Sequence, residues 1–311
     1  MRRSRKNLAK AMRDGDFVVS VQIDPPKSAN ASDITNVVRQ LKKAGVSLLD
    51  VNSSKINSNG HISHDSIHLA SNLAELGFDT ISHVTLRDSA LSGILNQILA
   101  AYAWQDMRNF LIITGDPHRM PKNVMPLLNV PKINIIKALG FMSFQLRKAL
   151  ELDVALGAAI NQNATKRSYE ITRVGRKRKA GADFFMSQPV FSEKQFMRLL
   201  AMYDAAFASR PGKRASRPPL MVGIWPLVSQ KTIERIRNGR VDGVLIPKDL
   251  YAAASAHGED SKKLSAWGLA HAENLVETIR KSKKAQGVYL VAPSRDPLQL
   301  LPLLEELRSN L

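Results

Sequence analysis

Asn109-Phe110-Leu111-Ile112-Ile113-Thr114-Gly115-Asp116-Pro117 is the stretch of sequence that says most about the fold. Its apolar run, rich in isoleucine and leucine, predicts a buried β-strand, and the Gly-Asp-Pro that follows predicts the turn that ends it. In a barrel of parallel strands such a turn lies at the carboxyl-terminal rim, where active sites are built. Asp116 is therefore either a ligand-binding carboxylate or an ordinary turn residue, since Gly, Asp and Pro all favour turns for local reasons.

Short apolar segments of this kind, rich in β-branched residues, recur along the whole chain. There are eight, at residues 17–23, 48–51, 80–85, 110–114, 154–159, 184–187, 220–224 and 288–292. Stretches with helical periodicity separate them, so the chain alternates between strand and helix. This alternation predicts an α/β fold with a single (β/α)8 TIM barrel. A doubly wound open sheet is the alternative, but no predicted strand is followed by Gly-x-Gly-x-x-Gly.

We do not expect strands and helices to be evenly spaced along the sequence. We predict that residues 1–16 form a basic N-terminal extension or helix and that residues 17–311 form the barrel domain. The C-terminal third is elaborated, with a short turn or strand at residues 241–246 and an amphipathic helix at residues 264–279. A proline-containing loop is expected before a helix at residues 133–150.

The charge of the chain is strongly positive, at +18, from 45 Lys and Arg against 27 Asp and Glu. The basic residues cluster at residues 2–6, 166–179, 210–217 and 281–284. Such an excess indicates a solvated surface, attraction of an acidic small molecule, or nucleic-acid binding. None of the clusters is interleaved with aromatic residues, as a base-stacking surface would require, so nucleic acid is disfavoured.

Composition excludes several classes of protein and site. The 311 residues include no cysteine, which rules out disulfides, thiolate metal sites and a cysteine nucleophile. No segment approaches the roughly 18 apolar residues of a membrane span, and no apolar core follows the basic start, so we expect a cytoplasmic protein. Neither His-Glu-x-x-His nor Gly-x-Ser-x-Gly occurs, so neither a metal site nor a hydrolase triad is predicted.

Polar residues just after the predicted strands are the candidates for chemistry in a TIM barrel. They are Gln22, Asp24, Asn52, His83, Asp116, Asn161, Gln188 and the stretch 226–231. Asp24 lies two residues after Gln22, so both side chains point to the same side of an ideal strand.

Six motifs, in order, resemble those of one family, methylenetetrahydrofolate reductase, the flavoprotein barrel of one-carbon metabolism. They are SVQIDPP at residues 20–26, SHVTLRD at 82–88, ITGDP at 113–117, AGADFFMSQPVF at 180–191, GIWPLV at 223–228, and IPK at 246–248 followed by GLAHA at 268–272. The resemblance runs from about Phe17 to Arg295. It implies a barrel that binds FAD across its C-terminal face and reduces methylenetetrahydrofolate to methyltetrahydrofolate with NADH or NADPH.

The resemblance also implies roles for individual residues. Asp116 would lie beside flavin and folate and favour the cationic intermediate of the substrate, and Gln188 would hydrogen-bond the pterin. His83 would contact the flavin, with Asn52 and Gly115 in the same cofactor site. Arg176 and Lys177 would meet the phosphates and ribityl chain of FAD. The basic excess would suit the acidic glutamate tail of folates.

The sequence departs from the family pattern at several of these positions. Gln22 stands where the family has a glutamate general acid, and an amide cannot donate a proton as a carboxylic acid does. Asp24, two residues later, is the candidate substitute. Asn52 replaces a flavin-contacting threonine, and Gln230 stands where an aromatic side chain can stack on folate. Residues 160–162 replace a Tyr-Pro-Glu stretch, and residues 131–132 replace an acidic or serine-bearing turn.

Three hypotheses for the function follow. The first is an active FAD-dependent reductase of a folate. The second is a divergent member that binds folate or flavin without catalysing the reduction, as a homo-oligomer or as a subunit of a larger complex. The third is an unrelated basic barrel that binds nucleic acid or an acidic metabolite. Flavin absorbance of the purified protein separates the first from the second.

Overall fold

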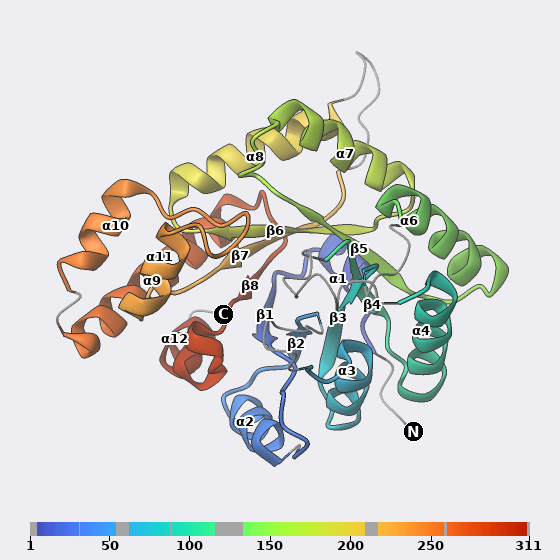
Figure 1. The fold of residues 1–311 in the computed structure, drawn as a ribbon, viewed down its shortest axis with the longest axis horizontal. Coiled ribbons are helices and arrows are strands. Elements are labelled where there is room, and N and C mark those ends of the chain that lie inside the picture. Colours follow the sequence, from blue (N-terminus) through green and yellow to red (C-terminus); the bar gives the residue numbers. More distant parts are fainter. Residues whose placement is uncertain are drawn as a thin grey trace, which may run out of the picture.

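Eight parallel strands close into a ring in chain order in the computed structural model of the chain, β1 next to β2 and so on until β8 pairs with β1 (Figure 1). The structure describes residues 5–30, 32–53, 62–87, 89–115, 133–208, 217–257 and 260–309. The strands are β1 (Val18–Ile23), β2 (Leu48–Val51), β3 (Asp79–Thr85), β4 (Asn109–Ile113), β5 (Ala155–Ile160), β6 (Phe184–Val190), β7 (Leu220–Ile224) and β8 (Gly287–Leu290). The predicted (β/α)8 TIM barrel is therefore confirmed, with all eight strands at the predicted places.

Helices surround this ring and connect its strands. They are α1 (Leu8–Arg13), α2 (Ser32–Lys43), α3 (Ser66–Glu75), α4 (Leu91–Gln105), α6 (Ile135–Ser143), α7 (Arg167–Lys179), α8 (Glu193–Phe207), α9 (Gln230–Arg237), α10 (Lys248–Ser255), α11 (Ser261–Ser282) and α12 (Leu301–Ser309). Helix α6 continues as a π-helix over Phe144–Ala149, and short 3-10 turns at Pro293–Arg295 and Pro297–Leu300 lead into α12. Residues 241–246 form turns and not a strand.

Alternation of side chains along the strands builds two separate apolar layers. One set of strand residues points outward and packs beneath the helices, with Leu49, Phe110 and Val222 completely buried. The other set points into the barrel, where Ile81, Phe184 and Met221 fill its lower part. The barrel is thus a packed core whose upper, carboxyl-terminal end remains available for polar side chains.

Helix α1 closes the amino-terminal end of the barrel and lies at the centre of the ring of strands in Figure 1. Its buried residues Leu8, Ala9 and Met12 pack against the inner apolar layer. Asn109 fixes this helix from inside the barrel, since its Oδ1 accepts from the Leu8 amide at 2.8 Å and its Nδ2 donates to the Lys6 carbonyl at 3.0 Å. Helix α1 and the residues just before it, from Lys6 on, therefore contribute to the barrel floor.

The elaborated C-terminal third forms an extension beside the barrel, made by α9, α10 and α11 at the left of Figure 1. It has its own apolar cluster, in which Leu227, Ile233 and Leu264 are buried. The predicted helix at residues 264–279 is confirmed as part of α11. Hydrogen bonds connect this extension to the barrel wall, among them those from Gln195 Nε2 to the Leu245 carbonyl and between His271 Nε2 and the Phe191 carbonyl.

Candidate functional site

The carboxyl-terminal rim holds most of the residues that the sequence singled out. Gln22 lies near the end of β1, Asn52 directly follows β2, and His83 lies in the second half of β3. Gln188 lies on β6, where the pairing with β7 shifts register between Met186 and Pro189. Because all eight strands are parallel, these positions share one end of the barrel.

Asp24 is held by two partners at this rim. Its Oδ1 accepts from Asn52 Nδ2 at 2.8 Å, and its Oδ2 lies 3.3 Å from Arg295 Nε. Arg295 follows β8 and adopts a φ of 66°, directly after Ser294 with a φ of 50°, both in the left-handed region that L-residues rarely adopt. Such strain persists where the surrounding structure fixes it, often at ligand sites. The contacts of Asp24 are those of a charged carboxylate.

Arg295 was not among the residues predicted for the site. It could have been predicted from the sequence. Polar residues that follow the strands lie at the carboxyl-terminal rim, and this rule, which selected Asn52 and Asp116, also applies to Arg295 after the last strand. Gln22, in contrast, has no hydrogen bond from its side-chain amide to another residue in the described part of the chain, and it is half-buried. The structure therefore joins Asp24, Asn52 and Arg295 into one cluster, and among the described residues the Gln22 amide is not bonded to any of its members.

A layer of polar side chains lies inside the barrel, below the rim. Asp50 on β2 is completely buried, and its Oδ1 accepts from Ser20 Oγ at 2.8 Å. His83 Nε2 lies 3.5 Å from Asp50 Oδ2, and the side chain of His83 is 8% exposed. Tyr289 donates its hydroxyl proton to the Ser187 carbonyl at 2.6 Å. Sequence reasoning missed Asp50, although a carboxylate within the apolar run Leu48–Val51 was a visible signal.

The side-chain amides of Asn161 and Gln188 both lie against Gly243, at the ends of β5 and β6. A Cβ added at Gly243 would lie 3.1 Å from Asn161 Nδ2 and 3.6 Å from Gln188 Cδ, and Gly243 has a φ of 75°. Gln162 holds the backbone of Gln188, donating to its carbonyl at 2.8 Å and accepting from its amide at 3.1 Å. Asn163, which follows Gln162, donates from its Nδ2 to the Gly243 carbonyl at 2.9 Å. Gln188 is therefore presented by a rigid backbone.

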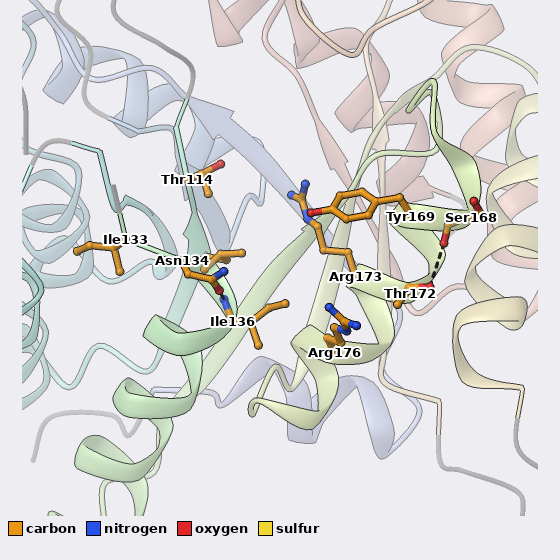
Figure 2. Close-up of a pocket in the computed structure, with 10 residues that line it drawn as sticks. Thr114, Ile133, Asn134, Ile136, Ser168, Tyr169, Thr172, Arg173 and Arg176 are labelled. Atoms are coloured by element: carbon orange, nitrogen blue, oxygen red, sulfur yellow. Dashed lines mark hydrogen bonds between the residues drawn. The ribbon is translucent and has the colours of Figure 1, made fainter. Parts of the chain in front are cut away.

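An open pocket of about 570 Å³ lies where β4 ends, between the start of α6 and one face of α7 (Figure 2). The lining residues are Thr114, Ile133, Asn134, Ile135, Ile136, Ser168, Tyr169, Thr172, Arg173 and Arg176. In Figure 2 the side chains of Arg173 and Arg176 reach from α7 into the space opposite Ile136, and the Tyr169 hydroxyl lies beside Arg173. Two guanidinium groups together with hydroxyl and amide groups favour an anionic ligand with apolar parts.

Lys177, which the sequence assigned to the same role as Arg176, is buried instead. It is 2% exposed, and its ammonium donates to the Ala159 carbonyl at 2.5 Å and lies 4.0 Å from Glu170 Oε1. Position 177 falls on the inner face of α7, whereas Arg173 and Arg176 face the pocket. The structure therefore does not support a contact between Lys177 and a phosphate, and Arg173, not Lys177, lines the pocket together with Arg176.

Because Lys177 is buried, its ionisation makes the free energy of unfolding depend on pH, and this dependence can be measured. Desolvation, assisted by the charge of Arg173 and opposed by Glu170, lowers its pKa from 10.5 to about 8. Between these values the unfolded chain binds a proton that the folded protein has released, so stability rises with pH across this window. Relative to Lys177→Met, the wild type should gain about 3 kcal/mol in free energy of unfolding between pH 7 and pH 10.5.

Urea denaturation of the two proteins at several pH values measures this difference. Lys179→Met is the matched control, because Lys179 is exposed near the end of the same helix and its substitution should give a difference that is flat with pH. A flat difference for Lys177→Met as well would show that the buried ammonium is not destabilised by its surroundings.

The remaining predicted residues lie elsewhere or outside the described part of the chain. Asp116 lies outside the described residues, and its role stays a prediction. Gly115 precedes it with a φ of 78°, and an added Cβ would lie 3.1 Å from Thr85 Cγ2, so glycine is needed there. Gln230 is the first residue of α9 and donates to Glu234 on its own helix at 3.0 Å, so its contact with folate also stays a prediction.

The described residues contain neither a cluster of metal-binding side chains nor a helix suited to a membrane. No group of three or more His, Asp or Glu side chains lies close enough together to bind a metal ion there. Within the same residues, no helix has both the length and the apolar composition needed to span a bilayer.

Comparison with known proteins identifies one family. The sequence model described as methylenetetrahydrofolate reductase matches residues 7–299. No curated protein sequence matches the chain.

Several solved structures share the architecture. An uncharacterized protein from Clostridium thermocellum, described as binding two copies of 5-methyl-5,6,7,8-tetrahydrofolic acid, has a TM-score of 0.64 at 15% identity, covering 98% of this chain and 100% of that chain. EDTA monooxygenase (EmoA) from Chelativorans sp. BNC1 has a TM-score of 0.56 at 12% identity, covering 95% and 94%. DmoA from Hyphomicrobium sulfonivorans has a TM-score of 0.56 at 8% identity, covering 95% and 88%. At such identities the likeness shows the fold alone.

Proposed function

The chain belongs to the methylenetetrahydrofolate reductase family, and from this premise we propose that it binds FAD along its carboxyl-terminal rim and reduces methylenetetrahydrofolate to methyltetrahydrofolate with NADH or NADPH. FAD, when bound, supplies the hydride transfer, and the protein supplies placement and charge. The protein would act as an oxidoreductase on a folate in the cytoplasm.

The pocket beside α7 is the observation that carries this proposal. Arg173 and Arg176 offer guanidinium groups that fit a diphosphate, and Ser168 and Tyr169 add hydroxyl donors, whereas the Thr172 hydroxyl donates to the Ser168 carbonyl at 3.0 Å. The apolar side of the pocket, at Ile133 and Ile136, suits the rest of a dinucleotide. The donor set is therefore of the kind that the phosphate end of FAD requires.

The pocket adjoins the rim, where the other candidate residues lie. Thr114, at the end of β4, belongs to the pocket lining and directly precedes Gly115 and Asp116. His83 and Asn52 would hold the flavin ring, and Gln188, with its backbone fixed by Gln162, would hydrogen-bond the pterin. Asp116 would stabilise positive charge on the substrate. The net charge of +18 favours the approach of an acidic folate.

A second candidate function rests on the first two strands. Gln22 cannot act as a general acid, and Asp24 is engaged by Asn52 and Arg295. These contacts favour a protein that binds folate or flavin but opens the folate ring slowly or not at all, as a homo-oligomer or as a subunit of a larger complex. The Clostridium thermocellum protein that binds methyltetrahydrofolate agrees with a binding role of this fold.

The experiment that tests the proposal has two steps. Purified protein is first titrated with FAD, following the flavin absorbance and fluorescence. The complex is then mixed anaerobically with NADH or NADPH, and next with methylenetetrahydrofolate, in a stopped-flow instrument. Loss and return of the oxidised flavin absorbance support the reductase; flavin binding without return of absorbance supports the second candidate. A protein that binds neither FAD nor folate contradicts both.

A further inference from the structure

Asp50 is a carboxylate with no access to water, and its charge needs partners inside the barrel. Its side chain is 0% exposed and lies on β2, above the apolar layer that fills the lower barrel. A buried carboxylate is tolerated only when hydrogen bonds or an opposite charge compensate for the lost hydration. One oxygen, Oδ1, has such a partner in the Ser20 hydroxyl. The other, Oδ2, has no hydrogen bond within the described residues.

Tyr289 does not supply the missing proton. Burial of its phenol, with the nearby charge of Asp50 as a further cause, raises the pKa of Tyr289 well above the usual value. However, its hydroxyl proton is already donated to the Ser187 carbonyl at 2.6 Å. The phenol therefore stays protonated and directed away from Asp50.

His83 is the remaining partner. Its Nε2 lies 3.5 Å from Asp50 Oδ2, and each of these two buried atoms lacks any other hydrogen bond in the described part of the chain. This separation is a few tenths of an ångström longer than a good hydrogen bond. The two unsatisfied atoms thus face each other, one an acceptor and the other a nitrogen that can carry a proton.

We propose that Asp50 is a positioning residue that holds the proton of His83 on Nε2 and thereby makes Nδ1 the nitrogen that His83 offers to a bound molecule. The hydrogen bond at one ring nitrogen decides which nitrogen of a neutral imidazole carries the proton. With Nε2–H directed to Asp50, Nδ1 keeps its lone pair and accepts a hydrogen bond. Ser20 fixes the rotation of the carboxylate from the opposite side.

The consequence for ligand binding rests on the proposed function, in which His83 contacts the flavin ring. A histidine with one fixed tautomer accepts a hydrogen bond at a defined place and does not have to select the correct form at each binding event. The tautomer itself depends only on the barrel interior, so it can be tested without any ligand.

Nitrogen NMR of the protein labelled with ring-¹⁵N histidine tests the tautomer directly. The chain has seven histidines, and His83→Gln assigns the signal by its loss. At mildly alkaline pH, where free imidazole is neutral, we expect the proton on Nε2 and the lone pair on Nδ1 in the wild type. In Asp50→Asn, the amide can turn its NH₂ to the ring, so the proton should move to Nδ1 in most molecules. Ser20→Ala, the matched control, removes the other hydrogen bond of the same carboxylate and should leave the proton on Nε2.

Two results overturn the inference: a wild-type His83 with its proton on Nδ1, or an Asp50→Asn spectrum identical to that of the wild type. If Asp50→Asn does not fold, the wild-type spectrum alone decides. A titration with FAD forms a second arm, in which Asp50→Asn should raise the Kd about tenfold and Ser20→Ala by about twofold or less. A wild-type protein with the expected tautomer but no affinity for FAD would overturn the proposed function and support the Asp50–His83 pair.

Discussion

Gln22→Glu will accelerate the folate half-reaction by at least about tenfold, the low end of what a positioned general acid contributes. The reason is that opening the five-membered ring of the substrate requires a proton, and the Gln22 amide cannot supply one. The Gln22 side chain has no hydrogen bond to other described residues and lies near the end of β1, so a carboxyl group placed there is not committed to another partner. Stopped-flow reoxidation of the reduced flavin by methylenetetrahydrofolate measures the effect.

Asp24→Asn is the companion variant. Because Asp24 already accepts from Asn52 and pairs with Arg295, we do not expect it to be the general acid, and its substitution should change the same rate by no more than about threefold. Gln22→Met is the control for size without an acid and should remain slow. The reduction of the flavin by NADH should be similar in all three variants, since it needs no proton from this position. If Asp24→Asn abolishes the folate step while Gln22→Glu leaves it unchanged, the proton donor is Asp24.

Replacing both Arg173 and Arg176 by glutamine will weaken FAD binding by about 100-fold, since each charged hydrogen bond to phosphate contributes roughly a factor of ten or more. Both side chains line the pocket at the end of β4. Each single variant should lose about tenfold, and added salt should weaken the wild type more than the double variant. Titration followed by flavin fluorescence gives the Kd.

Lys179→Gln is the matched control for charge, because it removes one positive charge from the end of the same helix without lining the pocket. It should change the Kd by about twofold or less through the long-range field alone. Equal losses for Lys179→Gln and Arg176→Gln would mean that the basic surface as a whole, and not this pocket, attracts the cofactor.

Most of the fold could be predicted from sequence because strand and helix periodicities agree with each other along the chain. The eight apolar runs indicate strands that are buried on both faces, because strands of a parallel sheet have nearly continuous hydrophobic sequences. The floor of the barrel could not be predicted in the same way. Asn109 stands at the start of the run that decided the fold, and only the closed barrel shows that its amide holds α1 in place.

The candidate site was predictable where it depends on position along a strand and not where it depends on contacts across the barrel. Gln22, Asn52 and Gln188 follow from the rim rule. The pairing of Asp24 with Arg295, residues from opposite ends of the chain, does not, because only the closure between β1 and β8 brings them together. The prediction for Lys177 was wrong because it was made together with that for Arg176. The two residues are adjacent on α7, and adjacent positions on a helix point in different directions.

The extension formed by α9, α10 and α11 has an apolar cluster of its own, separate from the layer beneath the barrel helices. An apolar cluster that packs outside the barrel can have its own free energy of opening, and amide hydrogen exchange measures it separately from that of the barrel. We expect the smaller cluster to open at a lower free energy, while the strands of the barrel keep their protection. Because Gly243 belongs to this part of the chain and lies against Asn161 and Gln188, such a partial opening would uncover the ends of β5 and β6 without unfolding the strands that carry them.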